Sequence, residues 1–376
     1  MTFDFLPALL AMSQIKGLLG IVGALGGLIF VHELGHFLMA KRMGMPVEVF
    51  SLGFGPRLVG FSWRETDVRL SALPLGGYVK LAGYNPEEPD AEDPHGFLMQ
   101  PAWKRLLFYA GGVLFNVLTA WVLLMVLETD QARITKFETH WQVGQVAKGS
   151  RAEAGGLKRG DELVRIGDLA FPAANKEKEV LPFWEKEVLP LIQSRPEQSV
   201  TFMVKRDGQT VELRLVPANE GGKGRLGFGP GMAMIPVERR PLRIGDLGTG
   251  FVQGSADTGY LAAGITFGIG KLVTGQASVK DMGGPGTIGV MAYRAAQSGW
   301  MDFINFVAFI SLNLAVLNAL PIPFLDGGHA AILIFEKLRR KDLSIQLKER
   351  ILMGGFIFLM GFMAFVVVLD ILRFRK

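Results

Sequence analysis

The chain is 376 residues long, 49% of its residues are hydrophobic, 20% are charged, and it contains no cysteine. The lack of cysteine excludes disulfide bonds, cysteine-ligated zinc fingers and cysteine proteases, so any bound metal must be held by His, Asp or Glu. The net charge is +5, but no basic stripe with interleaved aromatic residues accompanies it, so nucleic acid is not an expected partner. A charged share below the roughly 25% typical of soluble proteins, with the apolar residues gathered in blocks, predicts membrane spans.

The first predicted element is a membrane span. Residues 17–40 are apolar except for His32, Glu33 and His36, and they are long enough to cross about 30 Å of hydrocarbon at 1.5 Å per residue. We therefore assign residues 1–42 to a first transmembrane helix. A second span is predicted at residues 106–127, where Asn116 is the one strongly polar residue.

Two regions of mixed composition follow these spans. Residues 43–105 form a predicted cytoplasmic, membrane-associated β region, in which residues 68–72 alternate between apolar and polar side chains. Residues 128–243 are typical of a soluble, extracytoplasmic region. The Asp-Gly pair at 207–208 predicts a hairpin between strands at 201–205 and 211–216. The Gly-rich stretch 221–231 is expected to be a linker.

The last third of the chain is again mainly apolar. Residues 244–302 form an amphipathic or interfacial segment, in which residues 251–274 are compatible with an interfacial helix or a weak span. Residues 303–336 form a third transmembrane segment that two prolines interrupt. A basic loop at 337–350 and a fourth transmembrane helix within 351–376 complete the prediction. Basic residues mark this loop and the ends of the 43–105 region as cytoplasmic, which places residues 128–243 and both termini outside.

Two histidines in the first span carry the clearest chemical signal. His32-Glu-Leu-Gly-His36 is an HExxH sequence, and residues four apart on a helix share a face, so both imidazoles can reach one zinc ion. Glu33 can accept a proton from a water molecule that the metal activates. The alternative is a pair of buried histidines satisfied by hydrogen bonds. A Glu and two His inside a span are costly, however, unless they face a cavity or a ligand.

The third metal ligand has to come from a distant part of the sequence, because a catalytic zinc site takes three protein ligands and one open position. Asp326 is the best candidate, since the first and third spans run in the same direction and place it and the histidines at similar depth. His329 is the second candidate. Pro321 and Pro323 break the helix just before this point and free backbone groups to line a cavity.

The two motifs resemble those of the site-2 protease family of intramembrane metalloproteases, and the bacterial regulator of sigma-E protease branch looks closest. The resemblance rests on HELGH in the first span and on Asn-Ala-Leu-Pro-Ile-Pro-Phe-Leu-Asp-Gly-Gly at 318–328, and it covers nearly the whole chain. It implies that His32, His36 and Asp326 bind Zn²⁺ and that Glu33 is the catalytic base.

The resemblance also implies which residues bind the substrate. Asn318 would position the substrate backbone or the oxyanion, with Pro321 and Pro323 in the same segment, although Asn318 can equally cap the broken helix. Asn313 is a weaker candidate that can simply hydrogen-bond between spans.

The stretch 69–80 resembles the membrane-associated β-hairpin of the same family. An exposed strand edge beside the zinc can pair with an unwound substrate by strand addition. The alternative is a small sheet that only stabilises the fold. The candidate contacts in this β region are Gly53, Gly55, Leu70 and Ala72.

Residues 149–164 resemble part of a bacterial PDZ domain, which would cover about 138–218. Members of the sigma-E branch often carry two such domains, whereas this region has room for one. Such a domain can bind a peptide terminus or act as a size gate, and both readings stay open. The expected fold is a multi-pass α-helical membrane protein with about four transmembrane helices, a membrane-associated β-hairpin and an extracytoplasmic PDZ-like α+β domain.

The expected function is regulated intramembrane proteolysis in the bacterial cytoplasmic (inner) membrane, with the active site toward the cytoplasmic side. The expected partners are the lipid bilayer and single-span membrane proteins that another protease has already cut, such as anti-sigma-factor-like proteins or signal-peptide remnants. One alternative is a membrane PDZ scaffold or chaperone with an inactive metal site. Another is a metal transporter, which needs polar residues along a path rather than at one depth.

Overall fold

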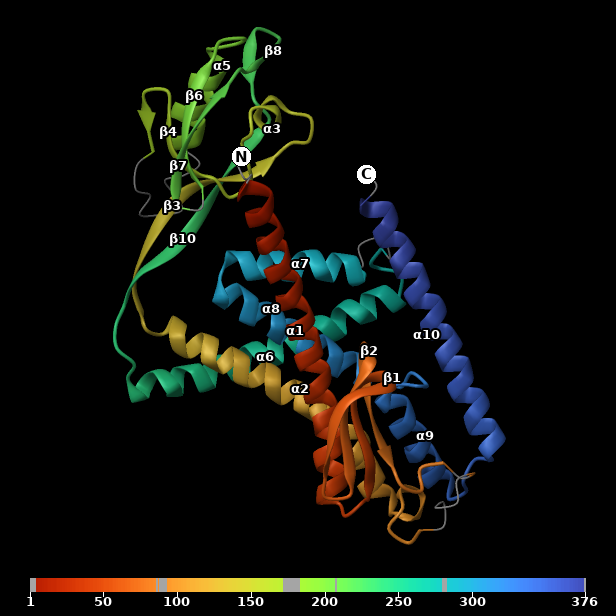
Figure 1. Ribbon diagram of the computed structural model, residues 1–376. Helices are drawn as coiled ribbons and strands as arrows, with labels where there is room; N and C mark the ends of the chain where they lie inside the picture. The colour runs from red at the N-terminus through yellow and green to blue at the C-terminus, as the bar shows by residue number, and fades with distance from the viewer. Residues whose placement is uncertain are drawn as a thin grey trace. The chain divides into compact units, whose positions relative to one another are not determined.

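The computed structural model of the chain describes residues 5–85, 87, 93–171, 183–206, 208–278 and 283–374. The chain forms two compact units (Figure 1). Unit 1 consists of Met1–Asp130 together with Ile244–Lys376, and unit 2 is Gln131–Arg243. Unit 2 is therefore an insertion between the two halves of unit 1.

Within the described residues, four helices of unit 1 are long and apolar enough to cross a membrane. They are α1 (Phe5–Arg42), α2 (Ala102–Gln131), α8 (Trp300–Ala319) and α10 (Ile345–Phe374). This agrees with the prediction of about four spans. The helix α6 (Ile244–Val273) is as long as α2 but is not among the four, which favours the interfacial alternative for residues 251–274.

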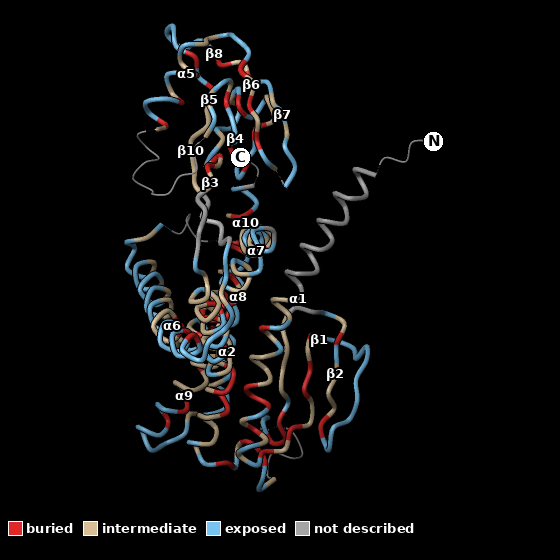
Figure 2. Tube along the Cα trace, turned by 90° about the vertical axis from the view of Figure 1, so that its left-hand side faces the viewer, coloured by how far each residue is buried: buried red, intermediate tan, exposed pale blue. Residues whose placement is uncertain are grey.

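The helices α1 and α2 approach each other closely at two glycines. A Cβ atom on Gly35 would lie 2.7 Å from the carbonyl carbon of Gly111, and one on Gly111 would lie 2.6 Å from the carbonyl oxygen of Gly35. Small residues allow membrane helices to pack backbone against backbone. The contact brings α2 against the turn of α1 that carries the two histidines, where buried positions are red in Figure 2.

The region after α1 is a β-sheet made of two long, bent strands. β1 (Val47–Trp63) and β2 (Thr66–Leu81) pair antiparallel across a tight turn. β1 bends at Gly53 and Gly55, which have φ of 90° and 86°, and β2 bends at Gly76, with φ of 131°; glycine adopts such angles at little cost. The bends bring residues 49–52 beside both 67–70 and 77–80.

The third apolar segment is interrupted, as the sequence predicts. α8 ends at Ala319, and α9 (Asp326–Arg339) begins after an irregular stretch of residues 320–325, which we call the proline loop. Proline donates no backbone hydrogen bond and its ring clashes with the preceding turn, so a helix cannot continue. The proline loop packs closely against two glycines that have no room for a side chain. A Cβ on Gly328 would lie 2.6 Å from the carbonyl carbon of Ile322, and one on Gly355 of α10 would lie 2.6 Å from Cβ of Pro323.

A carboxylate near the end of α10 fixes the start of α7 (Pro285–Ser298). Asp370 is 4% exposed and accepts hydrogen bonds from the backbone N–H groups of Gly284, Gly286 and Thr287 at 2.9–3.1 Å, and from the Thr287 hydroxyl at 2.6 Å. The first N–H groups of a helix have no partner within it, and a carboxylate there also meets the positive end of the helix dipole. This explains the Gly-Gly-Pro-Gly sequence at 283–286 as a structural element.

Unit 2 is built around a sheet with the strand order β10-β3-β4-β6-β7, with β5 paired to β4, and a separate β8-β9 pair. The strands are β3 (Ile134–Val146), β4 (Glu162–Ile166), β5 (Leu169–Ala170), β6 (Val200–Arg206), β7 (Gln209–Leu215), β8 (Ala218–Glu220), β9 (Lys223–Arg225) and β10 (Phe228–Arg239). The short helix α3 (Arg151–Ala154) and a helical segment made of a π turn (Trp184–Val188) and α5 (Leu189–Gln193) complete it. Its core is apolar, with Val143, Ile166, Phe202 and Val204 fully buried.

Two expectations for this region have opposite outcomes. The hairpin is confirmed, because β6 and β7 pair antiparallel from Val200↔Leu215 to Arg206↔Gln209; Asp207 lies outside the described residues. The linker expected at 221–231 is wrong, since this stretch contains β9 and the start of β10. Its glycines serve turns and contacts: Gly222 has a φ of 84°, and a Cβ on Gly224 would meet the carbonyl oxygen of Ile192.

Candidate functional site

Three side chains converge at the start of α9. The Nε2 atoms of His32 and His36, one turn apart on α1, lie 3.2 Å from each other. Each of them lies 3.3 Å from Oδ2 of Asp326, the first residue of α9. The break in the third segment makes this possible, because it places the Asp326 carboxylate at a helix end rather than along its side. Two residues of one motif and one residue 290 positions later thus form a nearly equilateral triangle of donor atoms.

The opposite ring nitrogens of both histidines are held by α2. His36 is 5% exposed, and its Nδ1–H donates to the carbonyl oxygen of Phe108 at 2.8 Å. Nδ1 of His32 lies 3.1 Å from the side-chain amide of Asn116, which is fully buried. A carbonyl oxygen can only accept, so Nδ1 of His36 carries a proton, and in the neutral imidazole the Nε2 lone pair then faces the centre of the triangle.

The amide of Asn116 fixes the tautomer of His32 in the same way. With its Nδ2 toward His32, its Oδ1 is buried and has no partner among the described residues. A half-turn of the amide exchanges the two ends; Oδ1 then accepts from Nδ1–H of His32, and Nδ2 takes the position without a partner. Both imidazoles then present Nε2 lone pairs to the Asp326 carboxylate, an arrangement that is repulsive without a cation between them.

The triangle has the dimensions of a zinc site. A tetrahedral zinc ion bound at about 2.0–2.1 Å requires donor atoms about 3.3–3.4 Å apart, and the three observed separations are 3.2, 3.3 and 3.3 Å. Two neutral imidazoles and one carboxylate also form a donor set that zinc accepts at catalytic sites. The residues present therefore fit this metal.

Glycines allow neighbouring segments to approach the site. A Cβ on Gly112 of α2 would lie 2.5 Å from Cε1 of His32 and would also overlap Nε2 of His36. A Cβ on Gly77 of β2 would lie 2.6 Å from Cγ of Glu33 and 2.9 Å from the carbonyl oxygen of Ser51. The sheet therefore packs directly against Glu33, whose carboxylate makes no hydrogen bond or ion pair within the described residues.

The other candidate residues of the third segment differ in their surroundings. Asn318 is half-buried near the end of α8, and its amide has no partner within the described part of the chain. Pro321 and Pro323 lie in the proline loop between α8 and Asp326. The Asn313 amide donates to the carbonyl oxygen of Phe309 in its own helix at 2.9 Å, and within the described residues it does not make the alternative hydrogen bond between spans.

The structure places the candidates of the β region mainly at its bends and exposed positions. Gly53 and Gly55 form the bend of β1. Leu70 is 40% exposed and Ala72 is half-buried on β2. The residue that contacts Glu33 is instead Gly77, within the same hairpin. Sequence alternation identified the hairpin but did not show which part of it reaches the carboxylate.

His329, the second candidate for the third ligand, does not join the triangle. Its ring stacks on that of Tyr109 with the centroids 5.1 Å apart. The group of residues that can hold a metal, within the described part of the chain, consists of His32, His36 and Asp326.

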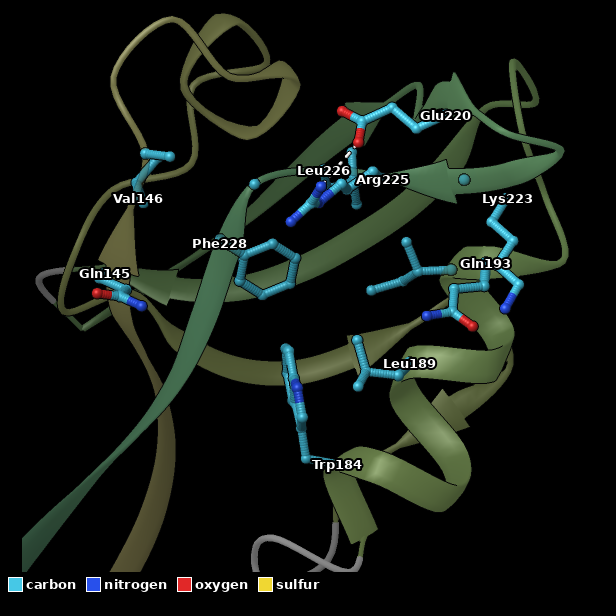
Figure 3. Close-up of a pocket in the computed structure, with 14 residues that line it drawn as sticks. Gln145, Val146, Trp184, Leu189, Gln193, Glu220, Lys223, Arg225, Leu226 and Phe228 are labelled. Atoms are coloured by element: carbon cyan, nitrogen blue, oxygen red, sulfur yellow. Dashed lines mark hydrogen bonds and ion pairs between the residues drawn. The ribbon is translucent and has the colours of Figure 1, made fainter.

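Unit 2 has a hollow of its own, about 630 Å³ in volume, between the start of β10 and the helical segment (Figure 3). The rings of Trp184 and Phe228 meet edge to face there, with centroids 5.3 Å apart. At the rim, Arg225 donates to the Glu220 carboxylate at 2.7 Å. β10 is the last strand of the sheet, and within the described residues it pairs only with β3. An unpaired strand edge beside a partly apolar hollow is suited to bind an extended peptide.

Comparison with known proteins gives a consistent result. The family model described as peptidase family M50 matches residues 20–362. The chain is 33% identical to a protein of Clostridium perfringens over 93% of this chain and 96% of that protein. It is 31% identical to a protein of Nostoc, over 93% and 94%, and 31% identical to one of Campylobacter jejuni, over 92% and 90%. All three carry the name "putative zinc metalloprotease". The chain therefore belongs to peptidase family M50.

Proposed function

We propose that this chain is a zinc endopeptidase that cleaves single-span membrane proteins inside the bilayer. The observation that carries the proposal is the triangle of two imidazole nitrogens and one carboxylate oxygen, with the Glu33 carboxylate, which has no partner among the described residues, on the same turn of α1. His32, His36 and Asp326 would hold Zn²⁺. When bound, the ion supplies a Lewis acid that polarises the scissile carbonyl and acidifies a water molecule. The names of the relatives support zinc as this metal.

Glu33 is the proposed general base. It follows His32 directly in the sequence, on the turn of α1 that carries both histidines, and no cation neutralises its carboxylate within the described residues, which supports this role. It would accept the proton of the attacking water and deliver it to the leaving amide nitrogen. A positioned general base contributes about 10²–10⁴-fold to the rate.

The substrate is proposed to lie as an extended strand along β2. A helical peptide bond is shielded, so the substrate span has to unwind before attack. Within the described residues, the ladder pairs 77–81 only with 47–52, so no other strand pairs with their second edge. A groove of about 290 Å³ follows this edge and is lined in part by Tyr78, Lys80 and Tyr84. Strand addition there would bring the scissile bond beside Glu33, and Asn318 would hold its carbonyl oxygen.

The proposed setting is the bacterial cytoplasmic membrane, with the triangle near its cytoplasmic side and unit 2 outside. The four apolar helices and the basic loops support this topology. We further propose that unit 2 is PDZ-like and that its hollow binds a peptide terminus, such as one left by an earlier cut. The free edge of β10 favours this reading over a size gate.

The test compares the wild type with Glu33→Gln in detergent. Both should bind about one zinc per chain, because Glu33 is not a ligand. Only the wild type should cut a panel of single-span substrates, and a chelator should abolish that activity. Glu65→Gln, an exposed carboxylate in the turn between β1 and β2, is the matched control and should keep full activity. Cutting that survives in Glu33→Gln, or a wild type that binds no zinc, would refute the proposal and favour the scaffold alternative.

A further inference from the structure

A second hollow adjoins the catalytic centre within unit 1. It is about 580 Å³ in volume, which is within the usual range for ligand sites. Its walls come from the residues after β2, the short helix η1 (Phe97–Met99), the start of α2, one face of α9 and the start of α10. Much of the lining is apolar, including Phe97, Leu333 and Leu352. None of the zinc ligands lies in it, so the proposed reaction leaves this hollow unexplained. We call it the Arg105 hollow, after the cation in its wall.

The Arg105 hollow continues the groove along the free edge of β2. Tyr84 and Asn85 line both the groove and the hollow. At the other side, His329 lines the hollow one turn after Asp326 and stacks on Tyr109. A chain that lies along the free edge of β2 therefore leads directly into the hollow. This continuity favours the substrate itself as the occupant over an unrelated molecule.

Arg105 is a cation without a counter-charge. Within the described residues its side chain makes no ion pair and no hydrogen bond, and its Nε atom is buried without a partner. The guanidinium carbon lies 5.9 Å from the centroid of the Phe97 ring. Arg105 is half-buried, so the loss concerns its Nε–H group, which has lost water without gaining a hydrogen bond and is therefore unfavourable.

The buried carboxylate of the hollow is not available to Arg105. Glu336 is 3% exposed, lies 2.7 Å from Nζ of Lys348, and accepts the backbone N–H of Leu343 at 2.7 Å. Its charge and its acceptors are therefore satisfied on the α10 side. Tyr84 remains a neutral hydroxyl donor, since burial raises the pKa of its side chain. Two more carboxylates line the hollow, Asp342 and Glu349; both are exposed, and within the described residues neither forms an ion pair with Arg105.

We infer that the Arg105 hollow receives the substrate residues next to the scissile bond and that Arg105 selects a carboxylate among them. This inference rests on the proposed function. An Asp or Glu side chain of the substrate would accept hydrogen bonds from the guanidinium while neighbouring apolar residues fill the rest of the hollow. A chain-terminal carboxylate of a cleavage product offers the same chemistry. Arg105 would then be a specificity-determining residue for the peptidase.

The test uses substrates in which a single Glu is moved along both sides of the cleaved bond, each with a Gln twin. In the wild type, kcat/KM should be at least about tenfold higher for Glu than for Gln at one or two adjacent positions. In Arg105→Gln this ratio should fall to about one, and in Arg105→Lys it should be partly kept. Arg350→Gln, an exposed arginine of α10 outside the hollow, is the matched control and should keep the full ratio. Equal zinc content in all variants shows that they are folded.

A binding arm separates this inference from the proposed function. Glu33→Gln protein, with or without Arg105→Gln, is titrated with the labelled Glu and Gln peptides, which requires no turnover. Preference for the Glu peptide that depends on Arg105 supports the hollow even if no substrate is cut. Product peptides with a free or an amidated carboxyl end show which carboxylate is bound. No discrimination between Glu and Gln at any position, or discrimination that persists in Arg105→Gln, would overturn the inference.

Discussion

Replacing Asn116 by Ala is expected to weaken zinc binding although Asn116 is not itself a ligand. The residue is fully buried on α2, and its amide is the group next to Nδ1 of His32. The alanine variant leaves that ring nitrogen in a dry environment without an acceptor, so the imidazole loses both its fixed orientation and the preference for the tautomer that binds metal.

The magnitude follows from the loss of one buried hydrogen bond to a metal-binding imidazole. Loss of such an outer partner typically costs 10–100-fold in metal affinity, or about 1.4–2.8 kcal/mol at 1.4 kcal/mol per tenfold. Competition between the purified protein and a fluorescent zinc chelator at neutral pH would measure it. Asn313→Ala is the matched control, because that amide donates to a carbonyl of its own helix, and its zinc affinity should equal that of the wild type.

Asn116→Asp tests the orientation of the amide. If His32 donates its Nδ1–H to Oδ1 of Asn116, then an aspartate, which only accepts, preserves the bond and zinc affinity stays at or above the wild-type value. If the amide instead donates to Nδ1, then aspartate shifts the imidazole proton to Nδ1 and zinc affinity rises above the wild-type value. Wild-type affinity in Asn116→Ala would refute the reasoning altogether.

Two further comparisons each pair a variant with a control at a similar residue in different surroundings. Gly355→Ala forces a methyl group into the proline loop, so it should lower the free energy of unfolding by about 1–3 kcal/mol and reduce peptidase activity. Gly354→Ala has open space around it and should be neutral or slightly stabilising; equal effects of the two would contradict the packing argument. Asp161 is 2% exposed and receives two 2.7 Å hydrogen bonds from Arg206. Arg206→Met leaves this buried carboxylate without its ion-pair partner, so it should destabilise unit 2 by about 3–5 kcal/mol in a denaturant titration. Arg214→Met, whose partner is an exposed carboxylate 3.5 Å away, should change stability by less than about 1 kcal/mol; a large loss there would argue against burial as the cause.

The parts of the site that follow from local geometry were predictable. The spacing of His32 and His36 on one helix face is a property of any α-helix, and the structure places their Nε2 atoms 3.2 Å apart. Asp326 was identified because the first and third spans run in the same direction and place it at the depth of the histidines, next to the prolines that end α8. These inferences needed only the helix period and the thickness of a bilayer.

The supporting residues could not be predicted because they depend on which helices pack together. Sequence reasoning cannot predict that the Phe108 carbonyl accepts a hydrogen bond from His36, because every residue has a backbone carbonyl. Asn116 did carry a signal as the lone strongly polar residue of its span, but nothing in the sequence indicated that it faces His32. Likewise, alternation within the hairpin does not show that the bend at Gly76 turns Gly77 toward Glu33.

The Gly-rich stretch in unit 2 misled sequence analysis for a different reason. A run of glycines is typical of a flexible linker, but glycine is also required wherever φ is positive or two backbones touch. Gly221, Gly222 and Gly227 have positive φ, and Gly224 lies against the carbonyl oxygen of Ile192. Composition alone does not distinguish these two uses.

The entry and exit of unit 2 lie side by side. The N–H of Arg240 donates to the carbonyl oxygen of Arg133 at 3.0 Å, Nε of Arg133 donates back to the carbonyl oxygen of Arg240 at 3.2 Å, and the ladder pairs Ile134 with Arg239. A folded module whose two ends meet can be spliced into or out of a host loop without stretching either. The two ends of unit 2 are thus suited to such an exchange. Replacing residues 131–243 by another module, or by a short turn, would change what this region binds without altering the three residues of the triangle.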